Sequence, residues 1–160
     1  MGERKSVTLL LQKSLTTFTG ASEPGAEQSS EQRLDITVLF TSVESTVAAL
    51  KRAGELASRL NGRITLLVPQ VVPYPLPLTS PPVLIDFNEK RFRVIAQESR
   101  VDTSVQVYLC RDRYETVESV LAPHSVVVLG FHDRWWPTAE TSLARRLRRA
   151  GHEVVVTRTE

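Results

Sequence analysis

Residues 36–68, ITVLFTSVESTVAALKRAGELASRLNGRITLLV, decide the fold class. The stretch opens with a short apolar run that is rich in β-branched residues, which is typical of a strand covered on both faces. Small and apolar side chains then recur three or four positions apart, the spacing of one helical face, at Val47, Leu50, Ala53, Gly54, Ala57 and Leu60. Asn61 and Gly62 suit a left-handed helix cap, and a second apolar run follows. The stretch therefore predicts a strand–helix–strand unit.

The same alternation continues to the end of the chain. Residues 69–82 contain six prolines and predict an irregular crossing. The later predicted elements are a helix at 86–99, a strand at 105–110, a helix at 114–121, a strand at 125–130, a helix capped by Thr141 or Ser142 and running to Ala150, and a strand at 153–158. This alternation favours a five-stranded parallel sheet with helices on both faces, a Rossmann-like α/β fold.

The composition excludes several classes of protein. Of 160 residues, 41% are hydrophobic and 24% are charged, and the formal net charge of +2 demands no polyanionic partner. Cys110 is the one cysteine, so no disulfide framework exists within the chain, and with three histidines there are too few soft ligands for a structural zinc site. No apolar run reaches the roughly 20 residues of a membrane helix. We therefore expect a soluble, cytoplasmic protein with no metal site and no membrane partner.

The first 33 residues differ from the rest. Residues 20–32, GASEPGAEQSSEQ, are small or polar and cannot bury enough area to offset the entropy lost on ordering. We expect residues 1–33 to form a flexible leader and residues 34–160 to form one α/β domain.

Two stretches resemble the universal stress protein family. Residues 36–57 are similar to the family's first strand, loop and first helix. In residues 125–156 an apolar strand ends in glycine, Thr-Ser-Leu-Ala opens a helix, and an apolar strand follows. The resemblance implies the strand order 3-2-1-4-5, with a ligand crevice between loops that begin at Thr41 and Gly130. It also implies a homodimer formed through the last strand, at Val154, Val155 and Val156.

The nucleotide signature of the family is altered in this chain. Members that bind ATP carry an acidic residue after the first strand and a Gly-x-x-Gly, nine residues, Gly-Ser/Thr pattern after the fourth. Glycines let backbone amides approach phosphates, and the helix N-terminus that follows favours their charge. Here Thr41, followed by Ser42, replaces the acid; Gly130 matches the first glycine, and Asp133 replaces the second.

The end of the signature is altered as well. If the loop is shortened by two residues, Thr141 takes the place of the last glycine and Ser142 that of the hydroxyl residue. We therefore expect a degraded nucleotide site in a non-enzymatic binding or regulatory module, without a bound cofactor and with a protein partner that the residues do not identify. The alternative is a protein that binds ATP in the crevice, with or without slow hydrolysis.

Three further features near the predicted crevice carry competing interpretations. Trp135 and Trp136 are either a contact for a partner or ligand, or a lid folded over the crevice, and both interpretations stay open. His132 and Asp133 resemble a base and its orienting acid, but no nucleophile is placed by the sequence, so we expect no catalysis. The prolines of residues 69–82 lack Pro-x-x-Pro spacing, which favours a plain connector over a ligand for an aromatic groove.

Two features elsewhere in the chain also carry competing interpretations. The last predicted helix carries Arg145, Arg146, Arg148 and Arg149, and positions 145, 148 and 149 share one face as a basic stripe. We favour a solvated face over nucleic-acid binding, because no aromatic platform accompanies the stripe. Cys110 precedes two cations that could lower the pKa of its thiol, Arg111 and Arg113. We favour a packed thiol at the end of a strand.

Overall fold

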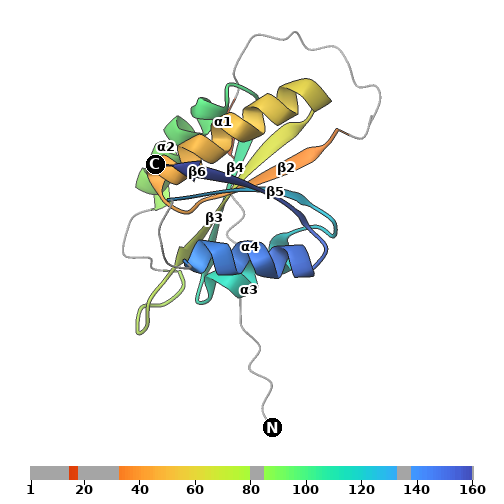
Figure 1. Ribbon diagram of the computed structural model, residues 1–160. Coiled ribbons are helices and arrows are strands. Elements are labelled where there is room, and N and C mark those ends of the chain that lie inside the picture. Colours follow the sequence, from red (N-terminus) through yellow and green to blue (C-terminus); the bar gives the residue numbers. More distant parts are fainter. Residues whose placement is uncertain (1–14, 18–32, 80–84, 133–137, 160) are drawn as a thin grey trace.

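The computed structural model describes residues 15–17, 33–79, 85–132 and 138–159 (Figure 1). Most of the predicted leader, residues 1–14 and 18–32, lies outside the described residues, and so do Asp133, Trp135 and Trp136. The expectations for these residues stay predictions.

One sheet of six strands forms the middle layer of the fold. Five of its strands are parallel: β2 (Asp35–Leu39), β3 (Arg63–Val71), β4 (Thr103–Cys110), β5 (Val126–His132) and β6 (Glu153–Thr159). They stand side by side in the order β4-β3-β2-β5-β6. Numbered along the chain from the first parallel strand, this is the order 3-2-1-4-5, so the predicted fold class and strand order are confirmed.

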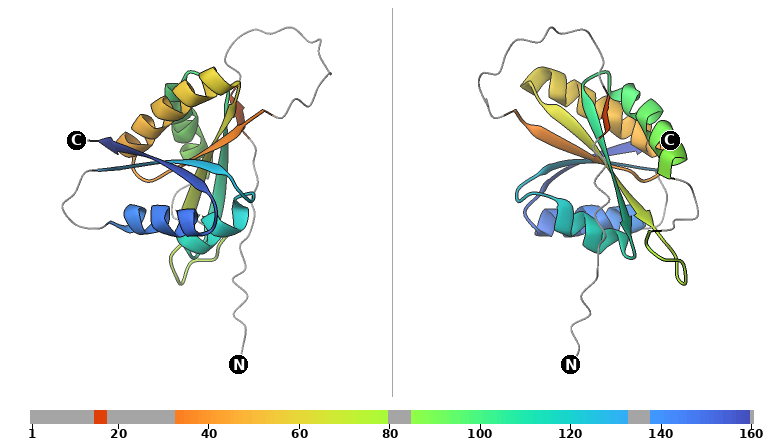
Figure 2. Two further views of the ribbon diagram at one scale, coloured as in Figure 1. Left: turned by 45° about the vertical axis from the view of Figure 1, so that its right-hand side comes forward. Right: turned by 180° about the vertical axis from the view of Figure 1, so that it is seen from behind.

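Helices cover both faces of the sheet (Figures 1 and 2). On one face lie α1 (Val43–Leu60), α2 (Ile85–Ala96) and the short 3-10 helix η1 (Gln97–Ser99), and on the other lie α3 (Arg113–Val120) and α4 (Ala139–Arg149). Crossovers between parallel strands are right-handed, so connections that run in opposite directions across the sheet place their helices on opposite faces. In the parts of the chain that the structure describes, no helix is long and apolar enough to cross a membrane.

Each face of the sheet has its own apolar core. Ile36 and Val38 of β2 pack toward α1 and α2, whereas Leu39 packs toward α3 and α4 with Leu143 and Leu147 of α4. Because the central strands contribute to both cores, their sequences are apolar runs and not strict alternations. This double burial is the physical reason why the strands could be predicted from their continuous apolar runs.

A sixth strand differs from the sequence-based expectation. β1 (Leu15–Thr17), inside the predicted flexible leader, pairs antiparallel with β4 at the edge of the sheet, where Thr16 lies opposite Ser104. The domain therefore includes at least these three residues of the segment that precedes Leu34.

Strand β3 is longer than predicted. The irregular crossing was expected to begin at Pro69, but β3 continues through Val71, so that expectation is wrong. The last residue of β2, Leu39, lies opposite Leu67, so beyond that point β3 pairs only with β4. Pro69 is tolerated because a proline without an N–H group can occupy a strand segment that has one neighbouring strand.

Candidate functional site

A crevice opens where the strand order reverses, between the carboxyl ends of β2 and β5. Ligands of open α/β sheets bind at such a point. The crevice has a volume of about 340 Å³ and is lined by Thr41, Ser42, Ser45, Phe131, His132, Thr138 and Glu140. Of the residues that the sequence analysis proposed for the site, Thr41 and Ser42 line it. Asp133 lies outside the described residues.

The hydroxyl and the backbone N–H of Thr41 both make hydrogen bonds within the protein. Its hydroxyl donates a hydrogen bond of 2.9 Å to the carbonyl oxygen of Gly130, and its backbone N–H donates to the hydroxyl of Thr46 at 3.1 Å. These two bonds fix the turn between β2 and α1. Thr41 therefore has a structural role at the position where the family resemblance implies a ligand contact.

Gly130 lies within β5, opposite Thr157 of β6, and not in the loop after the strand. A Cβ atom at this position would lie 2.0 Å from the carbonyl oxygen of Ser45, in the first turn of α1. No real pair of atoms comes so close, so only glycine lets α1 cross β5 at this distance. The requirement for glycine is explained by helix packing, and Gly130 is not among the residues that line the crevice.

Helix α4 begins earlier than predicted. Its N-cap is Thr138, whose side chain accepts from the backbone N–H of Thr141 at 3.4 Å, while the hydroxyl of Thr141 accepts from the N–H of Thr138 at 2.8 Å. The expectation that Thr141 or Ser142 caps the helix is therefore wrong, because both lie inside it. A capping box usually has Glu or Gln at its third helical position. Here Thr141 occupies that position, so the sequence pattern did not reveal the capping box.

Carboxylates occupy the first turns of both helices that start at the crevice. Glu140 of α4 lines it, and Glu44 of α1 lies 3.4 Å from Nε2 of His132. The other ring nitrogen of His132 lies 3.1 Å from the hydroxyl of Thr159 in β6. A helix N-terminus attracts anions, but a side-chain carboxylate already present there takes up that attraction. Sequence analysis missed Glu44 and Glu140, although acids are common in a first helical turn.

Two solved structures are similar to this chain. A protein of the universal stress protein family from Burkholderia pseudomallei superposes with a TM-score of 0.54 at 22% identity, over 81% of this chain and 98% of that one. The chain has the universal stress protein fold. A universal stress protein from Archaeoglobus fulgidus gives 0.52 at 12% identity, over 78% of this chain and 97% of that one. No protein-family model and no curated protein matches.

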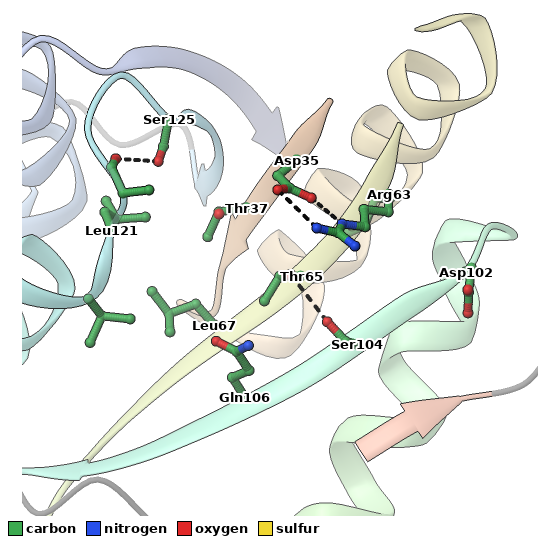
Figure 3. Close-up of a pocket in the computed structure, with 13 residues that line it drawn as sticks. Asp35, Thr37, Arg63, Thr65, Leu67, Asp102, Ser104, Gln106, Leu121 and Ser125 are labelled. Atoms are coloured by element: carbon green, nitrogen blue, oxygen red, sulfur yellow. Dashed lines mark hydrogen bonds and ion pairs between the residues drawn. The ribbon is translucent and has the colours of Figure 1, made fainter. Parts of the chain in front are cut away.

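A second cavity of this chain lies at the amino ends of the strands, at the edge of the sheet opposite the crevice (Figure 3). It has a volume of about 490 Å³ and is lined in part by Val120, the last residue of α3. Thr37, Thr65 and Ser104 stand in register on three neighbouring strands along its floor, with a hydroxyl contact of 3.2 Å between the last two. At its rim Arg63 and Asp35 face each other, and this ion pair raises the pKa of Arg63. Since open α/β sheets bind ligands at their carboxyl ends, the crevice remains the candidate site.

Cys110, at the end of β4, is a packed thiol. Its side chain is 1% exposed. Burial raises the pKa of the thiol, outweighing the hydrogen bond from Thr116 and the charge of Arg113, which lower it. The alternative, a thiol whose pKa is lowered by the neighbouring cations, is therefore wrong, and the packed-thiol interpretation is confirmed. Arg113 instead donates to the carbonyl oxygen of Phe40, at the end of β2.

Proposed function

We propose that the chain is a non-enzymatic binding or regulatory module with the universal stress protein fold, and that its crevice does not hold a nucleoside triphosphate. The observation that carries the proposal is the carboxylate of Glu140 in the first turn of α4, where phosphate oxygens would have to approach. Two like charges about 4 Å apart repel by roughly 1–4 kcal/mol between water and a protein surface.

The other candidate contacts also support the proposal. Gly130 is required by the packing of α1, and the hydroxyl of Thr41 already has an acceptor within the protein. Thr141 is engaged in the capping box of α4. The crevice therefore offers few unengaged donors among the described residues that line it.

The experiment is calorimetry of the full chain with ATP and magnesium, together with an assay of phosphate release. We expect no binding heat up to millimolar ATP and no hydrolysis above buffer. A micromolar affinity in the wild-type protein would overturn the proposal. Glu140→Gln removes the repelling charge at the crevice, and Glu115→Gln, in the first turn of α3, is the matched control. Affinity that rises in the first variant alone would place any residual binding in the crevice.

Self-association through β6 is the second part of the proposal. The outer edge of β6 pairs with no strand among the described residues. Val155 packs toward α1 and Val156 toward α4, so both faces of β6 are covered while its backbone edge stays open. An open strand edge is a template for pairing with another chain. A second copy that adds its own β6 would satisfy this edge.

Nucleic-acid binding is not part of the proposal. Two of the four arginines of α4 are engaged with the protein: Arg148, which belongs to the basic stripe, donates to the carbonyl oxygen of Val154 at 3.2 Å, and Arg146, beside the stripe, pairs with Glu118 at 3.0 Å. Arg146 also lies over the ring of Tyr114. These contacts favour a structural role for that face of α4.

A further inference from the structure

The segment between β3 and α2 projects beyond the sheet (Figures 1 and 2). Its residues 72–79, Val-Pro-Tyr-Pro-Leu-Pro-Leu-Thr, carry no charged side chain and are here called the tongue. A turn shapes it, in which the backbone N–H of Leu76 donates to the carbonyl oxygen of Pro73 at 3.1 Å. The tongue therefore has a defined backbone conformation.

Arg111 holds the tongue in place. One terminal nitrogen of its guanidinium donates to the carbonyl oxygen of Val72 at 2.6 Å, and the other donates to that of Leu76 at 2.7 Å. The guanidinium carbon also lies 4.1 Å from the centre of the Tyr74 ring. One cation thus binds both ends of the turn and stacks on the aromatic ring at its tip.

This arrangement leaves apolar side chains in water. Tyr74 is 81% exposed and Leu76 is 36% exposed. Packing of the domain core explains neither position, because neither side chain belongs to one of the two cores. A single exposed apolar residue needs no explanation, but here an arginine orders the segment that presents an exposed aromatic ring.

We propose that the tongue is a docking element that inserts into a pocket of another protein. The pocket has apolar walls that take the Tyr74 ring and Leu76, and a carboxylate at its rim. Tyrosine is enriched among the residues that dominate binding energy at interfaces, and an element already ordered in the free protein loses little entropy when it binds. The carboxylate is expected because guanidinium has five N–H donors, and Arg111 uses two of them in the bonds given above.

The sequence analysis favoured a plain connector because Pro-x-x-Pro spacing is absent. That criterion applies to an extended proline-rich ligand, whereas the tongue is a turn with Tyr74 at its tip. The proposal does not depend on the state of the nucleotide crevice, because tongue residues do not line it. Failure of one proposal therefore leaves the other standing.

The first experiment is photo-crosslinking with the full chain. p-Benzoylphenylalanine is placed at position 74, and at position 60 in a matched control, because Leu60 at the end of α1 is also a large apolar residue and is 56% exposed. After irradiation in a lysate of the source organism, adducts are identified by mass spectrometry. Capture from position 74 and not from position 60 identifies a candidate partner, and the affinities measured in the second experiment decide whether it supports the proposal. Absence of such an adduct, or capture of a second copy of the chain alone, would overturn the proposal.

The second experiment measures the affinity of the purified captured protein for defined variants. We expect Tyr74→Ser to weaken binding about tenfold or more, and Leu60→Ser to leave it unchanged. Arg111→Gln should weaken binding as well, because it releases the turn. The thermal unfolding midpoint of Tyr74→Ser should match that of the wild-type protein, since the side chain is exposed. Equal affinities of the wild-type and Tyr74→Ser proteins would contradict the proposal.

Discussion

The hydroxyl of Thr41, just after β2, donates to the carbonyl oxygen of Gly130 within β5 across 2.9 Å, although the two residues lie 89 positions apart in the sequence. Both residues stand where a nucleotide contact was expected. The bond ties the turn after β2 to the backbone of β5, so two residues expected at a ligand site act as a structural link.

Thr41→Val tests this link. Valine keeps the shape of the side chain but removes the donor, so we expect the free energy of unfolding to fall by about 1 kcal/mol. Chemical denaturation measures the change. Thr41→Ser retains a hydroxyl and should lose less than the valine variant. Equal stability of the valine variant and the wild-type protein would show that the bond contributes nothing.

Gly130→Ala tests the crossing of α1 over β5. The added Cβ would lie 2.0 Å from the Ser45 carbonyl oxygen, a backbone atom that cannot rotate away. We expect a loss of at least about 2 kcal/mol in unfolding free energy, or no folded protein, because overpacking at a rigid contact forces backbone shifts. Circular dichroism during denaturation measures it, and a fully stable variant would contradict the crossing. Larger substitutions at Gly130 are therefore unsuitable as ligand-binding tests.

Thr138→Ala tests the start of α4. Loss of the N-cap side chain should lower the unfolding free energy by about 1 kcal/mol. Ser142→Ala is the matched control, because Ser142 lies inside the helix and should be close to neutral. If the control were the more damaging substitution, the helix would begin where the sequence pattern suggested and not at Thr138.

The thiol of Cys110 gives a prediction about alkaline pH. Burial raises its pKa above the ordinary value of 9.0, so the unfolded chain loses this proton before the folded protein does. The stabilisation is therefore complete below pH 9.0 and is lost as the pH rises through the folded-state pKa. We expect the stability difference between the wild-type protein and Cys110→Ala to shrink above that pH. In native protein at pH 7, alkylation of Cys110 should be far slower than in denaturant.

Light scattering tests the pairing of β6 strands. A strand-paired dimer should have about twice the monomer mass of 17.9 kDa, and its fraction should rise with concentration. A monomer at high concentration would contradict self-association. It would leave the interpretation of the crevice unaffected, because no residue of β6 lines the crevice.

The fold class could be predicted because strands buried on both faces must be apolar throughout. The place of the crevice followed from the strand order that the family resemblance implied. The roles of its residues could not be predicted, because they depend on distances between elements remote in sequence. Nothing local to Gly130 indicates that Ser45 lies against it. Nothing in the sequence near Pro69 indicates that β2 ends at Leu39, opposite Leu67, and leaves the rest of β3 with one neighbouring strand.

The short strand β1 limits how far copies of this protein can assemble. It lies along β4, so one side of the sheet ends in a three-residue strand, too short to template a new neighbour well. Among the described residues, β1 covers residues 103–105 of β4 and leaves the outer edge of residues 106–110 unpaired, so β6, with 7 residues, is the longer of two open borders of the sheet. If two copies join at β6, only the shorter border at residues 106–110 of β4 is left for a third copy, so growth beyond the pair is disfavoured.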